Sequence, residues 1–294
     1  MRAEWLDLST GINPIAYPIP PITADAWTAL PDRAAHHALE DAARVFWKVP
    51  KQAAIMAVPG ASSAIAQIPR LADVKTVSIP GPTYNEHAAS FVALGWRVTQ
   101  TSGTANASVH VNPNNPDGRI WQTSDPHGDL RIIDESFCDV TPGDTLIAQA
   151  TTPGTLVLKS FGKFWGLAGL RLGFVIGDPE LIERLRAMIG PWAVAGPALT
   201  IGTAALRDQA WADATRLRLQ QDADRLDHLL TSKGANLVGG TTLFRLYDVP
   251  NAVEWQEALA QHHIWSRIFP YSQSWLRLGL PGPDGWARLE QALA

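Results

Sequence analysis

Short apolar runs alternate with stretches of helical periodicity over most of the first 180 residues. The alanine-rich segment Ala34–Trp47 has its apolar positions at helical spacing and predicts a helix. We expect further helices at Ser62–Leu71, Tyr84–Leu94 and Pro179–Ile189. This alternation predicts an α/β domain with a mostly parallel sheet flanked by helices. The expected strands are Ala54–Val58, Thr76–Ile79, Trp96–Thr99, Val109–Val111, Leu130–Ile133, Thr155–Leu158 and Gly173–Ile176.

Both ends of the chain follow other patterns. Residues 1–31 are rich in proline, which cannot continue a helix or a strand ladder, and they predict an extended N-terminal arm. One long helix is expected over residues 198–231. The pattern predicts three parts: the arm (1–31), a large α/β domain (32–197) and a small α+β domain (198–294). The small domain's remaining elements are strands at Thr242–Leu246, Ile264–Ile268 and Trp275–Leu278, and helices at Val253–His262 and Gly285–Leu293.

Composition excludes several classes of protein. The chain of 294 residues is 46% hydrophobic, which is enough for a sizeable core, and its net charge of −4 offers no basic surface for nucleic acid or an anionic membrane. The single cysteine, Cys138, and the absence of an apolar leader predict a cytoplasmic protein. The uncharged stretch 187–206 has the length of a membrane span, but glycines and prolines interrupt it, so we expect a buried loop that runs into a helix. No metal-ligand set is apparent around the histidines.

Lys163 is the first candidate for chemistry. It lies in SFGKFWGLAGLRLGF (residues 160–174), a glycine-rich and largely uncharged segment. A desolvated lysine is an amine nucleophile suited to Schiff-base chemistry, although a lysine on a surface loop would also fit. Ser160 and Arg171 on either side of it could hold a phosphate group near the amine.

Other candidates follow predicted strands. Residues 60–62 in PGASSAI could bind an anion at the start of a helix, or form an ordinary strand–turn–helix connection. Asp134 ends the run IIDES and could pair with a protonated ring nitrogen, or be an exposed acid at a strand end. Asn115 could donate to a ring oxygen or belong only to a turn, and Tyr84 could stack on an aromatic cofactor or fill the core.

In this order, these residues resemble the aspartate aminotransferase-like enzymes, the fold type I family that uses pyridoxal 5′-phosphate. The resemblance implies a large and a small domain, this cofactor, and a homodimer with active sites built across its twofold axis. It implies catalytic roles for Lys163 as the Schiff-base lysine, for Asp134 at the pyridine nitrogen and for Tyr84 stacked on the ring. Asn115 would bond the ring hydroxyl. The implied phosphate ligands are Gly60, Ala61, Ser62, Ser160 and Arg171.

Within the family, the chain most resembles the threonine-phosphate decarboxylase branch of cobalamin biosynthesis. WLDLSTGINP (residues 5–14), GPTYNEH (81–87) and VNPNNPDGR (111–119) are typical of that branch. The implied reaction converts L-threonine O-3-phosphate, a small phosphorylated amino acid, to (R)-1-amino-2-propanol phosphate and CO2. The implied substrate ligands are Asn13, Arg267 and Arg277. Phe137 favours this branch, because many aminotransferases have at this position a tyrosine that donates to the ring oxygen.

Three features depart from the family pattern. Relatives usually carry a His-Gly-Gly segment before WLDLSTGINP, and this sequence begins too late to include one. Leu30 stands where aminotransferases often have a tyrosine that reaches the neighbouring subunit. The connection from Gly118 to Leu130 is too short for much helix. Two alternatives therefore stay open: an aminotransferase of the histidinol-phosphate type, and a cofactor-binding protein without turnover.

Overall fold

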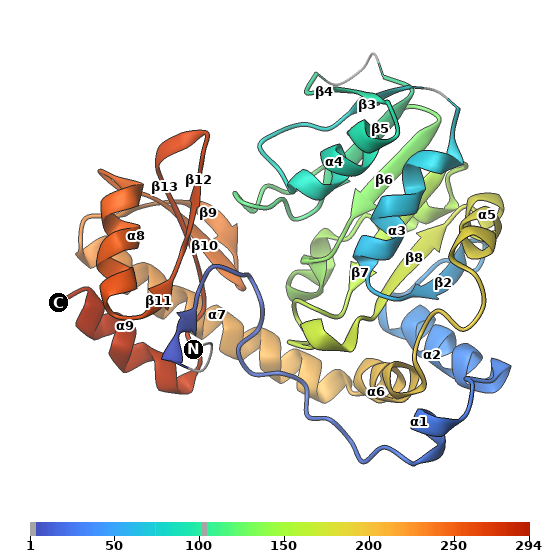
Figure 1. Ribbon diagram of the computed structural model, residues 1–294, viewed down its shortest axis with the longest axis horizontal. Coiled ribbons are helices and arrows are strands. Elements are labelled where there is room, and N and C mark those ends of the chain that lie inside the picture. Colours follow the sequence, from blue (N-terminus) through green and yellow to red (C-terminus); the bar gives the residue numbers. More distant parts are fainter. Residues whose placement is uncertain (1–3, 74, 102–104) are drawn as a thin grey trace.

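The computed structural model describes residues 4–73, 75–101 and 105–294, and it contains a large and a small sheet unit connected by a long helix (Figure 1). The large sheet has seven strands in the order β2-β8-β7-β6-β5-β3-β4. Only β8 runs antiparallel to its neighbours, so the sheet is mostly parallel, as predicted. Its strands are β2 (Ala54–Val58), β3 (Thr76–Ser78), β4 (Arg97–Thr99), β5 (Ala107–Val111), β6 (Leu130–Asp134), β7 (Thr155–Ser160) and β8 (Gly173–Gly177).

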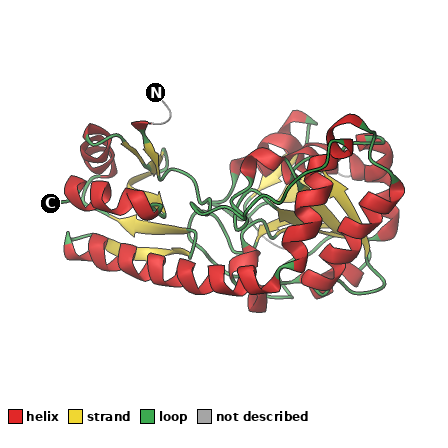
Figure 2. Ribbon diagram, turned by 90° about the horizontal axis from the view of Figure 1, so that it is seen from below, coloured by secondary structure: helices red, strands yellow, loops and turns green. Residues whose placement is uncertain are grey.

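Helices cover both faces of the large sheet (Figures 1 and 2). Side chains of a strand alternate between its two faces. In β2, Met56 and Val58 join one buried apolar cluster, whereas Ile55 and Ala57 join the other. Burial on both faces explains why the strands appear in the sequence as nearly continuous apolar runs. One face carries α3 (Ala61–Gln67), α4 (Asn85–Ala93) and α5 (Pro179–Ile189), and the other carries α2 (Arg33–Phe46) and α6 (Gly196–Arg207).

The small unit combines the C-terminal part of the chain with the start of the N-terminal arm. Its antiparallel sheet has the order β12-β13-β10-β9, and a separate parallel pair joins β1 (Leu6–Asp7) to β11 (Ile264–Trp265). The arm then runs to the large unit, where it forms the short helix α1 (Asp25–Thr28). The other elements are α7 (Gln209–Ser232), β9 (Asn236–Thr241), β10 (Phe244–Asp248), α8 (Ala252–Gln261), β12 (Arg267–Phe269), β13 (Ser272–Gly279) and α9 (Trp286–Ala292).

The prediction of one long helix over 198–231 is wrong, because the chain breaks at Asp208 into α6 and α7. Asp208 has non-helical backbone angles (φ −95°, ψ 73°), and its carboxylate accepts a hydrogen bond from Trp211 N at 2.9 Å. A side chain that accepts a hydrogen bond from a backbone N–H of the first turn caps that helix and favours a new helix start. The expected domain boundary after residue 197 falls inside α6, which packs against α2 of the large unit, so the second unit begins only along α7.

Most other predicted elements of the large unit are confirmed within two residues, but the small unit holds two differences. Strand β9 was not predicted, since its glycine pair, Gly239–Gly240, looks like a turn. The expected strand Ile264–Ile268 is two strands, β11 and β12, in different sheets.

The connection between β5 and β6 contains no helix within residues 112–129, as expected. The loop before α6 is largely exposed rather than buried, although α6 itself is buried along one side. Among the residues described, none of the helices has both the length and the apolar character that crossing a bilayer requires.

Candidate active site

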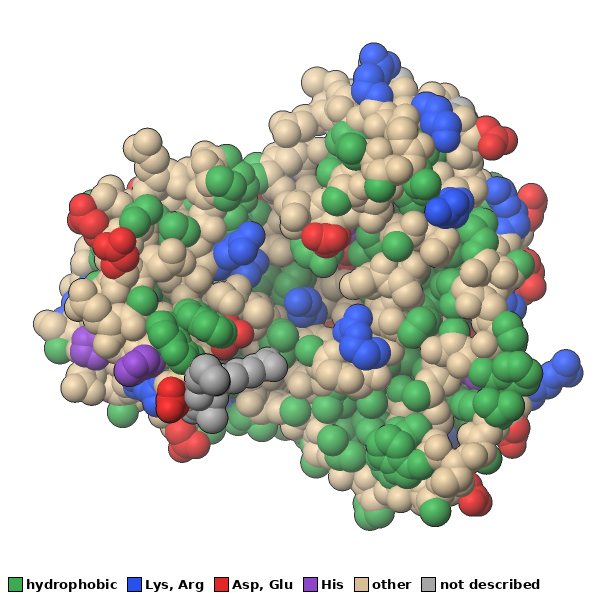
Figure 3. Space-filling model, in the orientation of Figure 1, with side chains coloured by type: hydrophobic (Ala, Val, Ile, Leu, Met, Phe, Trp, Pro, Cys, Tyr) green, Lys and Arg blue, Asp and Glu red, His purple; other side chains and the backbone are tan. Residues whose placement is uncertain are grey.

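The parallel strands of the large sheet end at one edge, and the predicted site residues gather there beside the small unit. Basic side chains line the hollow between the two units in the space-filling view (Figure 3). An inner cavity of about 130 Å³ lies at this edge. The residues predicted for the cofactor that line it are Ala61, Ser62, Tyr84, Asn115, Asp134, Ser160, Lys163 and Arg171.

Gly60 and Arg171 meet at the end of the inner cavity where the phosphate was expected. Gly60 has φ +81°, and a Cβ atom added to it would lie 2.4 Å from Arg171 Nη2. A side chain at residue 60 would therefore displace the guanidinium. Arg171 is itself left-handed (φ +54°), and its Nη1 donates to Ala168 O at 2.9 Å. Ser62, in the first turn of α3, and Ser160, at the end of β7, also line the inner cavity. Arg171, Ser62 and Ser160 together provide one cation and two hydroxyl groups that could bind an anion.

Lys163 lies in the loop after β7 and is largely enclosed. Burial lowers the pKa of its amine, and the neighbouring charges of Arg277 and Arg171 lower it further, while Asp134 opposes them. Its Nζ lies 5.3 Å from the centre of the Phe137 ring. A lowered pKa leaves a larger fraction of the amine neutral, and the neutral form is the nucleophile.

Asp134 is a buried carboxylate that stays ionised. Burial alone would raise the pKa of its carboxyl, but hydrogen bonds to the charged form outweigh burial and hold the pKa below its ordinary value. His87 Nε2 lies 2.8 Å from Oδ2, while Ser136 donates to Oδ1 from its backbone N–H at 3.0 Å and from its hydroxyl at 2.5 Å. The chain therefore places a fixed negative charge inside the cavity.

His87 is a site residue that the sequence analysis missed. It is 2% exposed and projects from α4 three residues after Tyr84, one helical turn further along. Its ring also meets Tyr84 edge-on, with 6.0 Å between ring centres. The signal was present in GPTYNEH, because side chains three apart in a helix share one face.

An outer cavity of about 630 Å³ adjoins the inner one and shares Tyr84, Asn115, Phe137 and Lys163 with it. Burial raises the pKa of the Tyr84 phenol, as do the charges of Glu86 and Asp134. Phe137 packs edge-on against Phe244 of β10, with ring centres 5.0 Å apart. The shared residues thus form one continuous wall from Lys163 to the small unit.

The outer cavity is strongly cationic because Arg267 on β12 and Arg277 on β13 are register partners. Arg277 is 7% exposed, and burial together with the charge of Arg267 lowers the pKa of its guanidinium to about 10. It donates to Asn115 Oδ1 and to Ser9 O, while its buried Nε has no hydrogen-bond partner among the described residues. This pair can bind anionic groups of a ligand.

Asn13 is the one predicted substrate ligand that the structure does not bring to either cavity. It is 2% exposed, and its Nδ2 donates to Phe164 O at 2.8 Å. Its Oδ1 accepts from Ile15 N at 3.0 Å and from Arg218 Nη2 at 2.7 Å. The expected substrate contact is therefore replaced by contacts within the protein.

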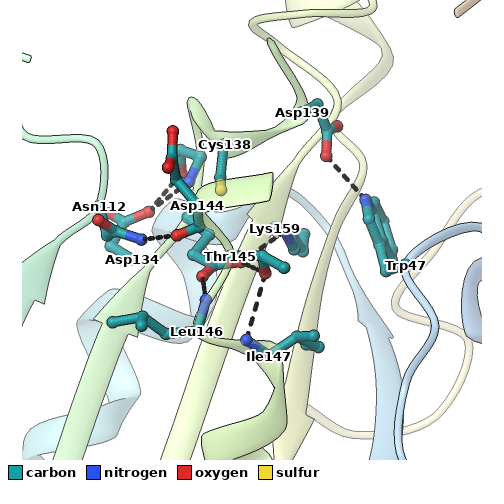
Figure 4. A network of polar contacts seen from close by, with 12 residues as sticks. Trp47, Asn112, Asp134, Cys138, Asp139, Asp144, Thr145, Leu146, Ile147 and Lys159 are labelled. Atoms are coloured by element: carbon teal, nitrogen blue, oxygen red, sulfur yellow. Dashed lines mark hydrogen bonds and ion pairs between the residues drawn. The ribbon is translucent and has the colours of Figure 1, made fainter. Parts of the chain in front are cut away.

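A buried polar network lies behind the site on the other face of the same strand ends (Figure 4). Glu135, next to Asp134, pairs with Lys159, next to Ser160, at 2.6 Å, and both side chains are almost fully buried. Asp139 accepts from the indole N–H groups of Trp47 at 2.7 Å and Trp165 at 3.1 Å. The sequence analysis missed this network, which ties together the strand ends that carry the site.

Within the described ranges, no group of three or more histidine, cysteine, aspartate or glutamate side chains could hold a metal ion. The candidate site offers the charged side chains of Lys163 and Asp134 and of three arginines, Arg171, Arg267 and Arg277. Its donors suit an organic ligand that bears anionic groups.

The chain matches known proteins over its length. The family model described as aminotransferase class I and II matches residues 22–286. Curated threonine-phosphate decarboxylases from a Sinorhizobium species and from Pseudomonas aeruginosa are 40% and 37% identical to the chain, and each comparison covers 99% of the chain and 92% of the relative. The solved structure of the histidinol-phosphate aminotransferase from Clostridium acetobutylicum has a TM-score of 0.84 at 19% identity, with 98% of each chain covered, and shows the same fold. The chain therefore belongs to the aminotransferase class I and II family.

Proposed function

We propose that this protein is a pyridoxal-phosphate-dependent decarboxylase, which converts L-threonine O-3-phosphate to (R)-1-amino-2-propanol phosphate and CO2 for cobalamin biosynthesis. The observation that carries the proposal is the pair Arg267 and Arg277 in a cavity that Lys163 also lines. Two cations beside one amine suit an amino acid with both a carboxylate and a phosphate group. The two curated decarboxylases that align with nearly the whole chain support this choice of substrate.

Pyridoxal 5′-phosphate is the cofactor of this family, and the inner cavity fits it. A buried carboxylate that stays ionised, as Asp134 does, suits a protonated pyridine nitrogen as its partner. Arg171, Ser62 and Ser160 would hold the phosphate group, and Lys163 would bind the cofactor covalently. Tyr84 and Asn115 would contact its ring.

The chain's own residues would divide the reaction between them. When bound, the cofactor supplies an electron sink for the charge left on Cα as CO2 departs. Asp134 would keep a proton on the ring nitrogen and so maintain that sink. Lys163 would then deliver a proton from Nζ to Cα, so that the electron pair of the broken carbon–carbon bond ends in a carbon–hydrogen bond. The lowered pKa of the Lys163 amine suits repeated proton exchange.

The two arginines would select the substrate and fix its orientation. Arg277, held by Asn115 and Ser9, is the better anchor for the carboxylate, because its direction is set before the substrate binds. The exposed Arg267 would bind the phosphate group. Phe137 lines both cavities without offering a hydroxyl, which leaves Asn115 to donate to the ring oxygen.

A substrate panel tests this proposal. The cofactor-loaded protein is mixed with L-threonine O-3-phosphate, L-threonine or L-histidinol phosphate, and the formation of CO2 and of pyridoxamine phosphate is followed. We expect CO2 from L-threonine O-3-phosphate alone. Transamination of L-histidinol phosphate would move the assignment to an aminotransferase, and binding of the cofactor without turnover of any substrate would indicate a protein without this activity.

We further propose that the protein is a cytoplasmic homodimer. Apolar side chains are exposed on the arm and on the loop before α6, where Trp27, Leu30 and Trp192 are 69%, 69% and 57% exposed. Burying such exposed apolar side chains against a second copy of the chain would favour a dimer. Light scattering at micromolar concentration should give the mass of two chains, and a fully active monomer would contradict the proposal. The chain has a single cysteine, Cys138, and can form no internal disulfide, which agrees with a reducing compartment.

A further inference from the structure

The N-terminal arm binds the backbone of the loop that carries Lys163. Three consecutive carbonyl groups of this loop accept hydrogen bonds from the arm: Lys163 O from Asn13 N at 3.0 Å, Phe164 O from Asn13 Nδ2 at 2.8 Å, and Trp165 O from Tyr17 N at 2.9 Å. Phe164 and Trp165 are 0% exposed, so water cannot replace these donors. Buried carbonyl groups without donors are costly, and the arm therefore determines where this loop can lie.

The arm and the loop also pack too closely for independent movement. Gly166 has φ +68°, and a Cβ atom added to it would lie 2.7 Å from Ala16 Cα and 2.9 Å from Asn13 O. Only glycine allows this approach. We call residues 13–17 the arm strap.

Asn13 has a single orientation in the arm strap. Its Oδ1 accepts from Ile15 N and from Arg218 Nη2, so a rotated amide would point its N–H groups at two donors. The Nδ2 group must therefore face Phe164 O. Arg218 is held in turn by Asp222 on α7 at 3.1 Å. The helix that connects the two units thus fixes Asn13, and Asn13 fixes the Lys163 loop.

We infer that Asn13 is a positioning residue for Lys163, oriented by Arg218, and not a ligand of the substrate. This inference rests on the proposed function in one respect, because it takes Lys163 as the amine that binds the cofactor. A reacting group displaced by about 1 Å can lose about a hundredfold in rate, so a loop held at three consecutive carbonyl groups matters for chemistry.

The isosteric change Asn13→Asp tests the inference. The aspartate keeps an oxygen for Ile15 N and Arg218 but presents a second oxygen, not a donor, to Phe164 O. We expect the dissociation constant for pyridoxal 5′-phosphate to rise about tenfold and kcat to fall about tenfold or more, with KM for L-threonine O-3-phosphate within about twofold of the original value. Amide hydrogen exchange over residues 161–170 of the cofactor-free protein should become faster.

Two further variants sharpen the comparison. Arg218→Met should change the same quantities in the same direction by a smaller factor, and it decides the matter if the Asn13→Asp variant does not fold. Asp222→Asn is the matched control: it removes the negative charge beside Arg218 but keeps an oxygen that can accept from it, and it leaves both bonds of the Asn13 oxygen, so we expect cofactor affinity and hydrogen exchange within about twofold of the original.

The outcomes distinguish a failure of the positioning role of Asn13 from a failure of the proposed function. A rise in KM for L-threonine O-3-phosphate with unchanged exchange and cofactor affinity would show that Asn13 binds substrate, and would overturn the inference. No change in any of these quantities would overturn it as well. If borohydride reduction of the unmodified protein attaches no cofactor to Lys163, the proposed function fails, and hydrogen exchange alone then decides whether the arm strap orders the loop.

Discussion

Asp134 shows how single residues prepare the site. A carboxylate with almost no exposure would normally be neutral, yet His87 and Ser136 keep it charged. Its position at a strand end was predictable, because parallel strands deliver their C-terminal side chains to one edge of the sheet. The position of His87 next to Tyr84 was also predictable, but its bond to Asp134 and the bond of Asn13 to Phe164 were not, because these partners are 47 and 151 residues apart in the sequence.

Replacing His87 tests the cause of this ionisation. His87→Phe removes a donor to a buried charged group and should lower the free energy of unfolding by about 1.5–3 kcal/mol at pH 7. His87→Gln keeps an N–H donor and should lose less. The folded-state pKa of Asp134 is lowered, so its contribution to stability is present above the ordinary carboxyl pKa of about 4 and is lost as the pH falls. Urea unfolding between pH 3 and pH 7 should therefore show that the free energies of unfolding of the original protein and of His87→Phe converge as the pH falls. A difference that is the same at every pH would contradict this explanation.

Lys163 carries a second prediction at this scale. Lys163→Ala should abolish the absorbance of the Schiff base between the chain and pyridoxal 5′-phosphate, because no other lysine among the described residues lines the inner cavity. Mass spectrometry after borohydride reduction checks this directly. The exposed Lys233→Ala is the control and should retain the full adduct. An adduct that persists in the Lys163 variant would assign the chemistry to another amine.

Elements of the large sheet were more predictable than those of the small unit. Strands such as β2 and β7 are buried on both faces, so apolar runs alone mark them. Strand β9 is mostly exposed and contains two glycines, so its own sequence does not mark it as a strand. It is a strand because it pairs with β10. The break between α6 and α7 was missed because the apolar stripe that predicted the helix lies within α7, while the break itself depends on one local contact, the capping by Asp208.

Asp208 provides the prediction at the scale of elements. Asp208→Ala should lower the free energy of unfolding by about 1 kcal/mol, because the first turn of α7 loses its side-chain acceptor. Asp208→Asn should retain most of the stability. On the same helix the exposed Asp224→Ala is the control, for which we expect a change within about 0.5 kcal/mol. Urea unfolding compares the three variants, and equal effects of both alanine changes would argue against a capping role.

At the scale of the whole molecule, the site exists only because two units meet. The large unit supplies Lys163 and Asp134, and the small sheet supplies Arg267 and Arg277. The division into a large and a small unit could be predicted from the changing pattern along the chain. The contact of Arg277 with Asn115 could not, because no local pattern encodes a bond across 162 residues.

Arg277 gives the prediction at this scale. Arg277→Gln should raise KM for L-threonine O-3-phosphate about a hundredfold, since truncating one partner of a buried charge pair costs about 2–5 kcal/mol. Cofactor affinity should change little, because Arg277 does not line the inner cavity. The exposed Arg267→Gln should raise KM by a smaller factor. Steady-state kinetics and a cofactor titration measure both, and an unchanged KM in the Arg277 variant would remove it from the substrate site.

The fate of the substrate carboxyl carbon tests the central claim most directly. Cofactor-loaded protein is given L-threonine O-3-phosphate labelled with ¹³C in the carboxyl group, and NMR follows the label. The label should leave as CO2 and bicarbonate, in equal amount to the 1-amino-2-propanol phosphate that forms. A label that stays in a keto acid, with pyridoxamine phosphate left on the protein, would contradict decarboxylation and assign the protein to transamination.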